Sequence, residues 1–184
     1  MRSIHRTLLV TLALTGASAA VTLAHAAVSR ATAADVAFTA TGPAGLKIVG
    51  KTSELSVSES EGNVIVRVPL ANVDTGISLR NRHMREKYLE VHKYPNAELV
   101  VGRAALKLPS GDGETGGEAT GTMSIHGRSH AVRFTYVTKR HGDRYHVTGS
   151  VPLDINDYGI EVPSYLGVTV KRDIAINVAF DAAE

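Results

Sequence analysis

Apolar and polar residues alternate along the chain from Asp35 onward, and short clusters of Gly, Asn, Asp and Pro interrupt the alternation. A period of two is typical of β-strands whose two faces meet different surroundings. Because the turn clusters divide the chain into segments of strand length, we expect about eight strands. The series that mark them are Val36 and Phe38; Leu46 and Ile48; Leu55 and Val57; Val64, Val66 and Val68; Leu99 to Leu108; Met123 and Ile125; Val132, Phe134 and Tyr136; Tyr145, Val147, Gly149 and Val151; and Val168, Val170 to Arg172, Ile174, Ile176, Val178 and Phe180.

Short turn sequences separate several of these strands: Glu61-Gly62-Asn63, Ile125-His126-Gly127 and His141-Gly142-Asp143. The segment from Pro109 to Gly117 contains four Gly residues and no large apolar one, so it is predicted to be a solvated hairpin loop. Consecutive hairpins indicate an antiparallel sheet. A sheet of this size tends to close on itself, because closure removes unpaired edges, and an eight-stranded barrel can hold one small ligand.

One segment departs from the period of two. Between Asn81 and about His92, apolar residues recur at helical spacing, at Met84, Tyr88 and Val91. Asn81 can cap the start of a helix, and Pro95 prevents its continuation. The pattern predicts a short helix that lies across the barrel at its mouth and packs through Met84 and Tyr88.

The first 26 residues have the pattern of a secretory signal. Arg2 and Arg6 supply a basic start, and an apolar run without a charge follows from Thr7 to Leu23. Ala24-His25-Ala26 then offers the small-x-small pattern at which signal peptidases cleave. We expect cleavage before Ala27, export to the periplasm or the medium, and a single mature domain over residues 27–184.

Charge and cysteine content exclude several function classes. The chain has 20 Lys and Arg and 18 Asp and Glu residues, and the signal carries two of the basic ones, so the mature domain is balanced at 18 against 18. A balanced surface lacks the basic footprint that nucleic-acid binding requires. The absence of Cys excludes disulfides, thiolate metal sites and lipid attachment at Cys.

Catalytic and metal-binding patterns are weak. His126 and His130 lie on either side of a turn, but no third ligand is nearby in the sequence, so no metal site is expected. The sequence has no Gly-x-Ser-x-Gly elbow, phosphate-binding loop or dinucleotide motif, and no cofactor is expected. The closely spaced acids, Asp154 with Asp157 and Glu86 with Glu90, are of a kind that is usually solvated or turn-forming. An enzyme is therefore not favoured.

Four stretches, in their order and spacing, resemble the YceI-like family of exported lipid-binding barrels. They are Asp74-Thr75-Gly76-Ile77 leading to Leu79-Arg80-Asn81-Arg82-His83-Met84-Arg85; Tyr88-Leu89-Glu90-Val91-His92-Lys93-Tyr94-Pro95; Met123-Ser124-Ile125-His126-Gly127; and Asp157-Tyr158-Gly159-Ile160 followed by Pro163 and Val168. The resemblance spans nearly the whole mature chain. It implies an eight-stranded antiparallel lipocalin-like barrel with one short helix, and a long isoprenoid or other amphiphilic ligand whose tail fills an apolar tunnel.

The resemblance also suggests where the ligand is held. Arg80, His83 and Arg85 match the family positions that would receive an anionic or quinone head. The alternative is a structural role, in which Asp74 pairs with Arg80 and locks the loop before the helix. Apolar contacts to the tail are expected from Phe38, Val66, Met84, Tyr88, Phe134 and Ile176.

The sequence departs from the family pattern at one place, and this leaves the identity of the ligand undecided. Many family members begin with an Asp-x-x-His-Ser segment, whereas this chain has Asp35-Val36-Ala37-Phe38-Thr39, without the His-Ser pair. We expect a carrier or reservoir, with Val66, Phe134 and Ile176 directed into a continuous apolar tunnel. The alternatives are a small-molecule stress protein or an enzyme, with at least two titratable groups gathered in the same cavity, and a structural protein with a filled barrel. The sequence does not decide between a monomer and a homodimer.

Overall fold

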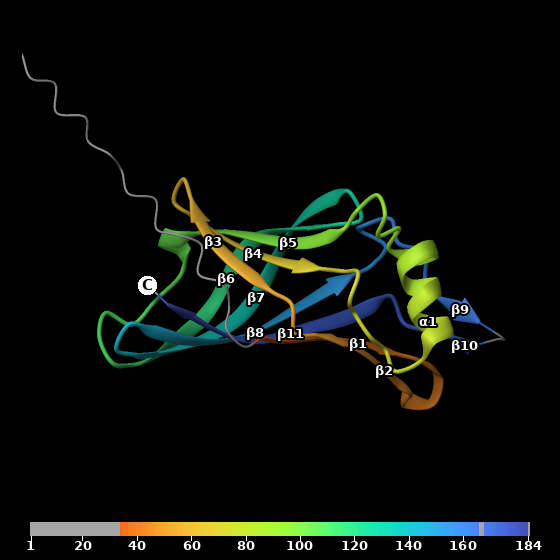
Figure 1. The fold of residues 1–184 in the computed structure, drawn as a ribbon, viewed down its shortest axis with the longest axis horizontal. Helices are drawn as coiled ribbons and strands as arrows, with labels where there is room; N and C mark the ends of the chain where they lie inside the picture. Colours follow the sequence, from red (N-terminus) through yellow and green to blue (C-terminus); the bar gives the residue numbers. More distant parts are fainter. Residues whose placement is uncertain (1–33, 166–167, 184) are drawn as a thin grey trace, which may run out of the picture.

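The computed structural model describes residues 34–165 and 168–183, so the expected signal and its cleavage site lie outside the described residues. One sheet of nine antiparallel strands dominates the fold, in the order β2-β1-β11-β8-β7-β6-β5-β4-β3 (Figure 1). Its strands are β1 (Ala34–Thr41), β2 (Lys47–Thr52), β3 (Ser56–Ser60), β4 (Asn63–Pro69), β5 (Asn96–Gly102), β6 (Gly113–Ile125), β7 (Arg128–His141), β8 (Arg144–Asp154) and β11 (Asp173–Ala183). The prediction of an antiparallel all-β fold is confirmed.

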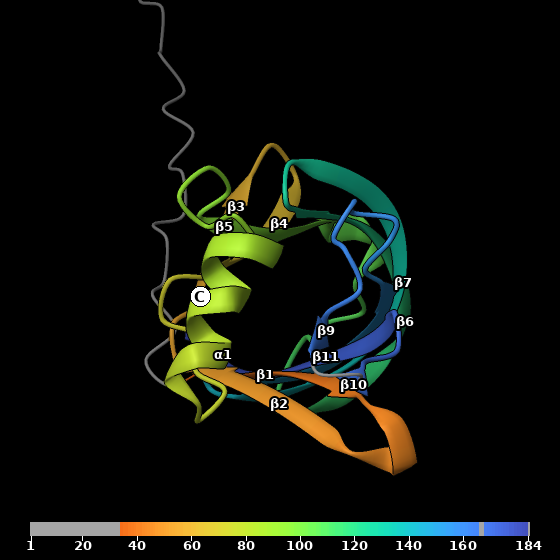
Figure 2. The same ribbon diagram turned by 90° about the vertical axis from the view of Figure 1, so that its right-hand side faces the viewer.

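The sheet curls strongly around an interior (Figure 2). Its two edge strands, β2 and β3, are consecutive in the chain and only Ser53, Glu54 and Leu55 lie between them. The two edges of the sheet are therefore connected by this short segment of the chain. In a closed barrel, hydrogen bonds between the two edge strands would connect them. If β2 and β3 are counted as one bent strand, the sheet has the eight strands expected of a barrel, although the sequence pattern marks the two separately, at Leu46 and Ile48 and at Leu55 and Val57. The free side of β2 is also bridged, since the peptide groups of Lys51 and Asp74 exchange two hydrogen bonds of 2.8 Å.

Tight turns join several neighbouring strands. In the turn between β6 and β7, His126 and Gly127 have φ of 53° and 73°, and Glu61 and Gly62 between β3 and β4 have 51° and 74°. Two consecutive residues with positive φ match the twist of antiparallel hairpins. Gly127 is required for a second reason, because an added Cβ would lie 2.5 Å from the ring of Tyr94. The predicted turns at these two places are confirmed.

Three strand predictions are wrong in part. Gly113 to Gly117 is not a loop but the first part of β6, paired residue by residue with β7. The strand predicted from Leu99 to Leu108 ends at Gly102, where a 3-10 turn, η3 (Arg103–Ala105), begins. The last predicted strand is divided. Val168–Thr169 forms β10 in a small separate hairpin with β9 (Ser164–Tyr165), and the long strand starts at Asp173.

The helix crosses one end of the curled sheet (Figure 2). It consists of α1 (Ser78–His83) continued by one π-helical turn, η2 (Met84–Tyr88), so it begins and ends earlier than predicted. Asn81 is not its cap but lies in its second turn with its side chain buried. No helix in the described ranges is long and apolar enough to span a membrane.

The helix is anchored by an apolar cluster at the end of the sheet. Met84 is 8% exposed and packs with Leu70 and Val73, which are 8% and 5% exposed. Phe38 from β1 packs against the same cluster. Apolar burial at Met84, rather than the short helical segment itself, therefore holds α1 and η2 against the sheet.

Met84→Ala should lower the free energy of unfolding by about 2–5 kcal/mol, because it leaves a cavity between the helix and the sheet. The matched control is Leu79→Ala on α1, where the side chain is 42% exposed. That change should cost well under 1 kcal/mol. Urea unfolding followed by circular dichroism measures both, and equal effects of the two substitutions would contradict this account of the helix.

Candidate ligand-binding cavity

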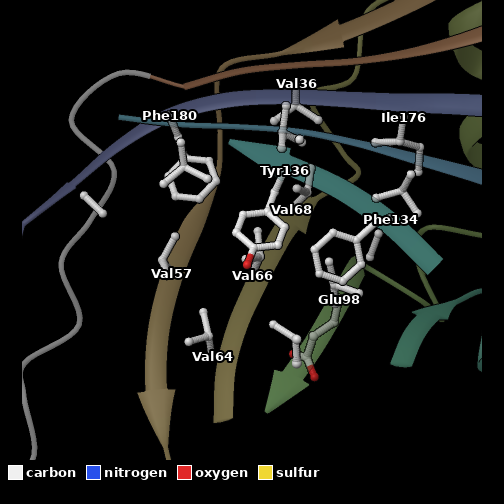
Figure 3. A pocket seen from close by; sticks show the side chains of 18 of the residues that line it. Val36, Val57, Val64, Val66, Val68, Glu98, Phe134, Tyr136, Ile176 and Phe180 are labelled. Carbon is white, nitrogen blue, oxygen red and sulfur yellow. The ribbon is translucent and has the colours of Figure 1, made fainter. Parts of the chain in front are cut away.

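The curled sheet encloses a cavity of about 500 Å³. Pockets of roughly 300–1,000 Å³ are typical of small-molecule sites. Figure 3 shows that side chains from several strands converge on this space. The apolar lining residues include Val36, Val57, Val64, Val66, Val68, Leu99, Val101, Phe134, Tyr136, Val151, Ile176, Val178 and Phe180.

Strand register explains why these side chains face inward. Val66 on β4 lies opposite Val57 on β3 and Leu99 on β5, and Val64 and Val68 share its face at a spacing of two. Although they point into the protein, Val57, Val64, Val66 and Val68 are only partly buried. Among residues 34–165 and 168–183, no side chain covers this wall completely, and the uncovered apolar surface borders the cavity.

The opposite wall is densely packed. Phe134 on β7, Met123 on β6 and Val151 on β8 are 6%, 5% and 4% exposed and belong to the main hydrophobic core. The rings of Phe134 and Tyr136 lie 6.0 Å apart and contribute to the same cavity surface. One wall of the cavity is therefore a firm aromatic and aliphatic core, and the other is a sheet of small valines.

The cavity is closed beneath the helix. Leu70 and Val73 line it at this end, and Met84 packs behind them. Both lining residues are buried, so the helix and its preceding loop cover the cavity where Leu70 and Val73 line it. We call this the closed end.

At the opposite end the cavity reaches the surface. The β3–β4 turn and the C-terminal end of β11 lie there, far from α1 (Figure 1). Glu59 and Arg103 line the cavity at this end, and their side chains are 47% and 38% exposed. Glu59 Oε1 and Arg103 Nε lie 4.0 Å apart, and the backbone N–H of Arg103 donates to Gly62 O in the turn. We call this the open end.

The structure places four of the nine predicted ligand contacts in the cavity lining: Phe38, Val66, Phe134 and Ile176. Met84 and Tyr88 are not among the lining residues. Met84 lies one layer behind the closed end, and Tyr88 packs against the main core from η2. In the structure, Met84 and Tyr88 pack against other side chains of the protein. Their contact with a ligand stays a prediction.

The predicted cluster of Arg80, His83 and Arg85 also lies outside the cavity lining. Arg80 donates to Thr75, from Nε to Oγ1 at 2.9 Å and from Nη2 to the backbone oxygen. Arg85 Nη1 donates to Ala71 O at 2.7 Å, and His83 is half-buried on the last turn of α1. The two arginines thus fasten the loop before the helix to the helix itself.

The structural alternative, in which Asp74 pairs with Arg80 to lock the loop before the helix, is wrong in the partner of Asp74. Asp74 Oδ1 instead accepts hydrogen bonds from Asn81 Nδ2 at 2.6 Å and from the backbone N–H of Gly76 at 2.8 Å. The amide oxygen of Asn81, Oδ1, accepts hydrogen bonds from the Thr75 backbone N–H at 2.8 Å and from Thr75 Oγ1 at 2.6 Å. A buried Asn with all these partners ties the loop to α1, which explains why Asn81 is inside the helix and not at its cap.

The sequence-based prediction missed Arg103 and Thr138, which both line the cavity. A usable signal was present. Arg103 follows Leu99 and Val101 at a spacing of two, and Thr138 follows Phe134 and Tyr136 in the same way. Both positions therefore fall on the inward face by the same alternation that placed the apolar residues.

His126 joins the helical region to the last part of the chain. Its Nε2 lies 3.0 Å from Glu90 Oε2, and its Nδ1 lies 3.1 Å from the backbone oxygen of Tyr158. Hydrogen bonds from Lys93 and His126 hold the pKa of the Glu90 carboxyl below its ordinary value. Within residues 34–165 and 168–183, no three His, Asp or Glu side chains are gathered for a metal ion. The contacts of His126 are those of a structural clamp.

Comparison with known proteins agrees with this architecture. The model of the YceI-like domain matches residues 21–182. The chain belongs to the YceI-like family. A UPF0312 protein of Pseudomonas putida (strain W619) is 26% identical over 128 residues, which cover 66% of this chain and 64% of that protein. A UPF0312 protein of Pseudomonas syringae pv. syringae (strain B728a) is 28% identical over 117 residues, which cover 60% and 58%. The chain thus spans a little under two thirds of these curated relatives.

Several solved structures share the fold. A polyisoprenoid-binding domain from Saccharophagus degradans, implicated in plant cell wall breakdown, superposes with a TM-score of 0.69 at 20% identity, over 85% of this chain and 98% of that one. BcnA of Burkholderia cenocepacia gives 0.64 at 16% identity, over 82% and 96%. The YceI protein of Campylobacter jejuni gives 0.55 at 18% identity, over 74% and 85%.

The Asp74–Asn81 contact makes a prediction about acid stability. Hydrogen bonds from Asn81 and then Gly76 hold the pKa of the Asp74 carboxyl below its ordinary value. Because the folded pKa is the lower one, the stabilisation is complete above the unfolded value and is lost as the pH falls through the folded value. Thermal melts between about pH 5 and about pH 2.5 should therefore show a smaller loss of melting temperature in Asp74→Asn than in the natural protein.

The control is the same substitution in an Asn81→Ala background, which lacks the principal hydrogen bond. There, Asp74→Asn should change the acid dependence much less. Equal acid profiles of the natural protein and the Asp74→Asn variant would show that the loop is not held by this carboxylate.

Proposed function

We propose that the protein holds a long-chain isoprenoid or a similar amphiphile in its cavity, as a carrier or reservoir that does not alter the ligand. The observation that supports this most strongly is the inward wall of partly uncovered valines around Val66, inside a cavity closed at one end. Apolar surface of this kind is stabilised when a hydrocarbon chain covers it.

Tail burial supplies enough free energy without specific contacts. Each CH₂-sized unit removed from water contributes about 0.8 kcal/mol. A cavity of about 500 Å³ accommodates many such units. Binding would therefore depend on the length of the apolar chain more than on any single side chain.

The charged groups of the lining favour binding over catalysis. Glu98 Oε2 is engaged by Arg67 of the neighbouring strand at 2.5 Å. Glu59 is paired with Arg103 at the open end. An arginine does not release its proton at neutral pH, so the Glu59–Arg103 pair is not an acid–base couple for general catalysis.

The similarity to the Saccharophagus degradans domain supports an isoprenoid as the ligand class, since that protein is described as a polyisoprenoid-binding domain. At 20% identity the similarity shows a shared fold only, and the ligand of this chain is our proposal. A continuous apolar interior, which both a prenyl chain and another long hydrocarbon chain would fill, is consistent with it.

The protein purified without detergent should release a stoichiometric long-chain apolar compound on organic extraction, identified by mass spectrometry. Phe134→Asp should abolish its retention, because a carboxylate in the cavity would cost several kcal/mol of lost hydration. Val66→Trp should reduce retention by filling the same space, and it keeps an apolar surface so that folding is preserved.

The matched control is Val137→Asp on the same strand. Val137 is 37% exposed and points away from the cavity, so this variant should retain the compound fully. The carrier proposal fails if the folded natural protein yields a clean extract and stays empty after incubation with polyprenyl lipids and quinones.

We further propose that the protein is exported and acts in the periplasm or outside the cell. The support is the basic start, the apolar run and the Ala24-His25-Ala26 pattern of the first 26 residues. Mass analysis of the protein recovered from its native compartment should give a chain that begins at Ala27. An exported form that retains Met1 would overturn this expectation.

A further inference from the structure

One hydroxyl in the lining of the cavity is buried and has no hydrogen-bond partner among the described residues, that of Thr138. The inward side chains of β7 are apolar at Val132, Phe134 and Tyr136, and the next one is Thr138. Thr138 is 1% exposed and lines the cavity. Its Oγ1 has no hydrogen-bond partner among the protein groups that the structure describes. Buried hydroxyls are normally paired, so this one requires an explanation.

The neighbouring polar groups do not provide it. Thr115 lies directly across from Thr138 in the β6–β7 register, but its Oγ1 donates to Lys107 O at 2.7 Å. The backbone N–H of Lys107 donates to the phenol oxygen of Tyr136 at 2.5 Å. The N–H and the C=O of Lys107 are thus both engaged, and Thr138 Oγ1, at a lining residue, is left without a partner among the described groups.

We propose that Thr138 Oγ1 is the hydrogen-bonding point for an uncharged oxygen of the ligand, a carbonyl or a hydroxyl. The inference rests on the proposed lipid-binding function and specifies the ligand class more closely. A hydroxyl can donate to a carbonyl oxygen or accept from an alcohol, and it can do both without any change of its own charge. A hydrocarbon without oxygen would leave the group unpaired.

An uncharged oxygen fits this position better than an anion. Thr138 is fully buried, and a phosphate or carboxylate placed beside it would lose its hydration without a cation in return. The arginine of the lining, Arg103, is already paired with Glu59 nearer the surface. The apolar residues from Tyr136 back to Met123 then extend from Thr138 toward the closed end, where the tail would lie.

The test compares two probes with one carbon skeleton on delipidated protein: the C20 prenyl alcohol geranylgeraniol and the C20 polyene that lacks the hydroxyl. Equilibrium dialysis gives the affinity for each. Thr138→Val preserves the shape of the side chain and removes the hydroxyl. It should weaken binding of the alcohol roughly threefold to tenfold and leave that of the hydrocarbon unchanged or improved. Thr135→Val, at an exposed position on the same strand, should change neither.

The outcomes separate this inference from the function on which it rests. If the natural protein binds both probes and Thr138→Val alters neither affinity, the role of Thr138 is overturned while lipid binding stands. The same conclusion follows if geranylgeranyl phosphate binds far more tightly than the alcohol and Thr138→Val does not affect it. If the folded natural protein binds none of the probes, the proposed function fails and the inference with it.

Discussion

The inner face of the curled sheet presents more apolar surface than the side chains of the described residues cover. On the side of β6 to β8 the inward residues include Met123, Phe134 and Tyr136, which belong to a densely packed core. On β3 and β4 they are valines, which end short of the centre. Proteins rarely leave contiguous apolar surface uncovered without a use for it. The valines of β3 and β4, set against the packed core on the other side, therefore leave the open space of the interior.

Much of this arrangement could be predicted from the sequence, because strand faces follow a strict period of two. The alternation at Val64, Val66 and Val68 placed these residues on one face, and the structure puts that face on the cavity. Phe134 and Ile176, which are expected to face inward with Val66, line the same space, and so does Phe38, which is expected as a ligand contact. Period-two patterns are reliable where one face is apolar, since a register slip of one residue would expose the whole set.

The departures come from contacts that local patterns do not contain. Asn81 has the composition of a helix cap, but the Asp74–Thr75 loop makes it a buried anchor inside the helix. Gly113 to Gly117 has the composition of a loop, yet β7 is long enough to pair with all of it. At Gly116 an added Cβ would lie 2.4 Å from the backbone oxygen of Tyr136, so the absence of a side chain serves the close approach of two strands. In both places tertiary contacts override local preference.

The two ends of the cavity differ, because the helix covers one of them and the other reaches the surface. His126 holds Glu90, just beyond the helix, to the backbone of Tyr158, and Asn81 holds the helix to the loop before it, so that end is fastened from two sides. A molecule with a long tail that fills such a space would go in tail first and come out head first. Any membrane or protein that receives it would have to meet the polar group before the hydrocarbon, and would have to approach beside the β3–β4 turn. Transfer of such a molecule to a receiver would then follow a fixed order, in which the polar head leaves through the open end before the tail.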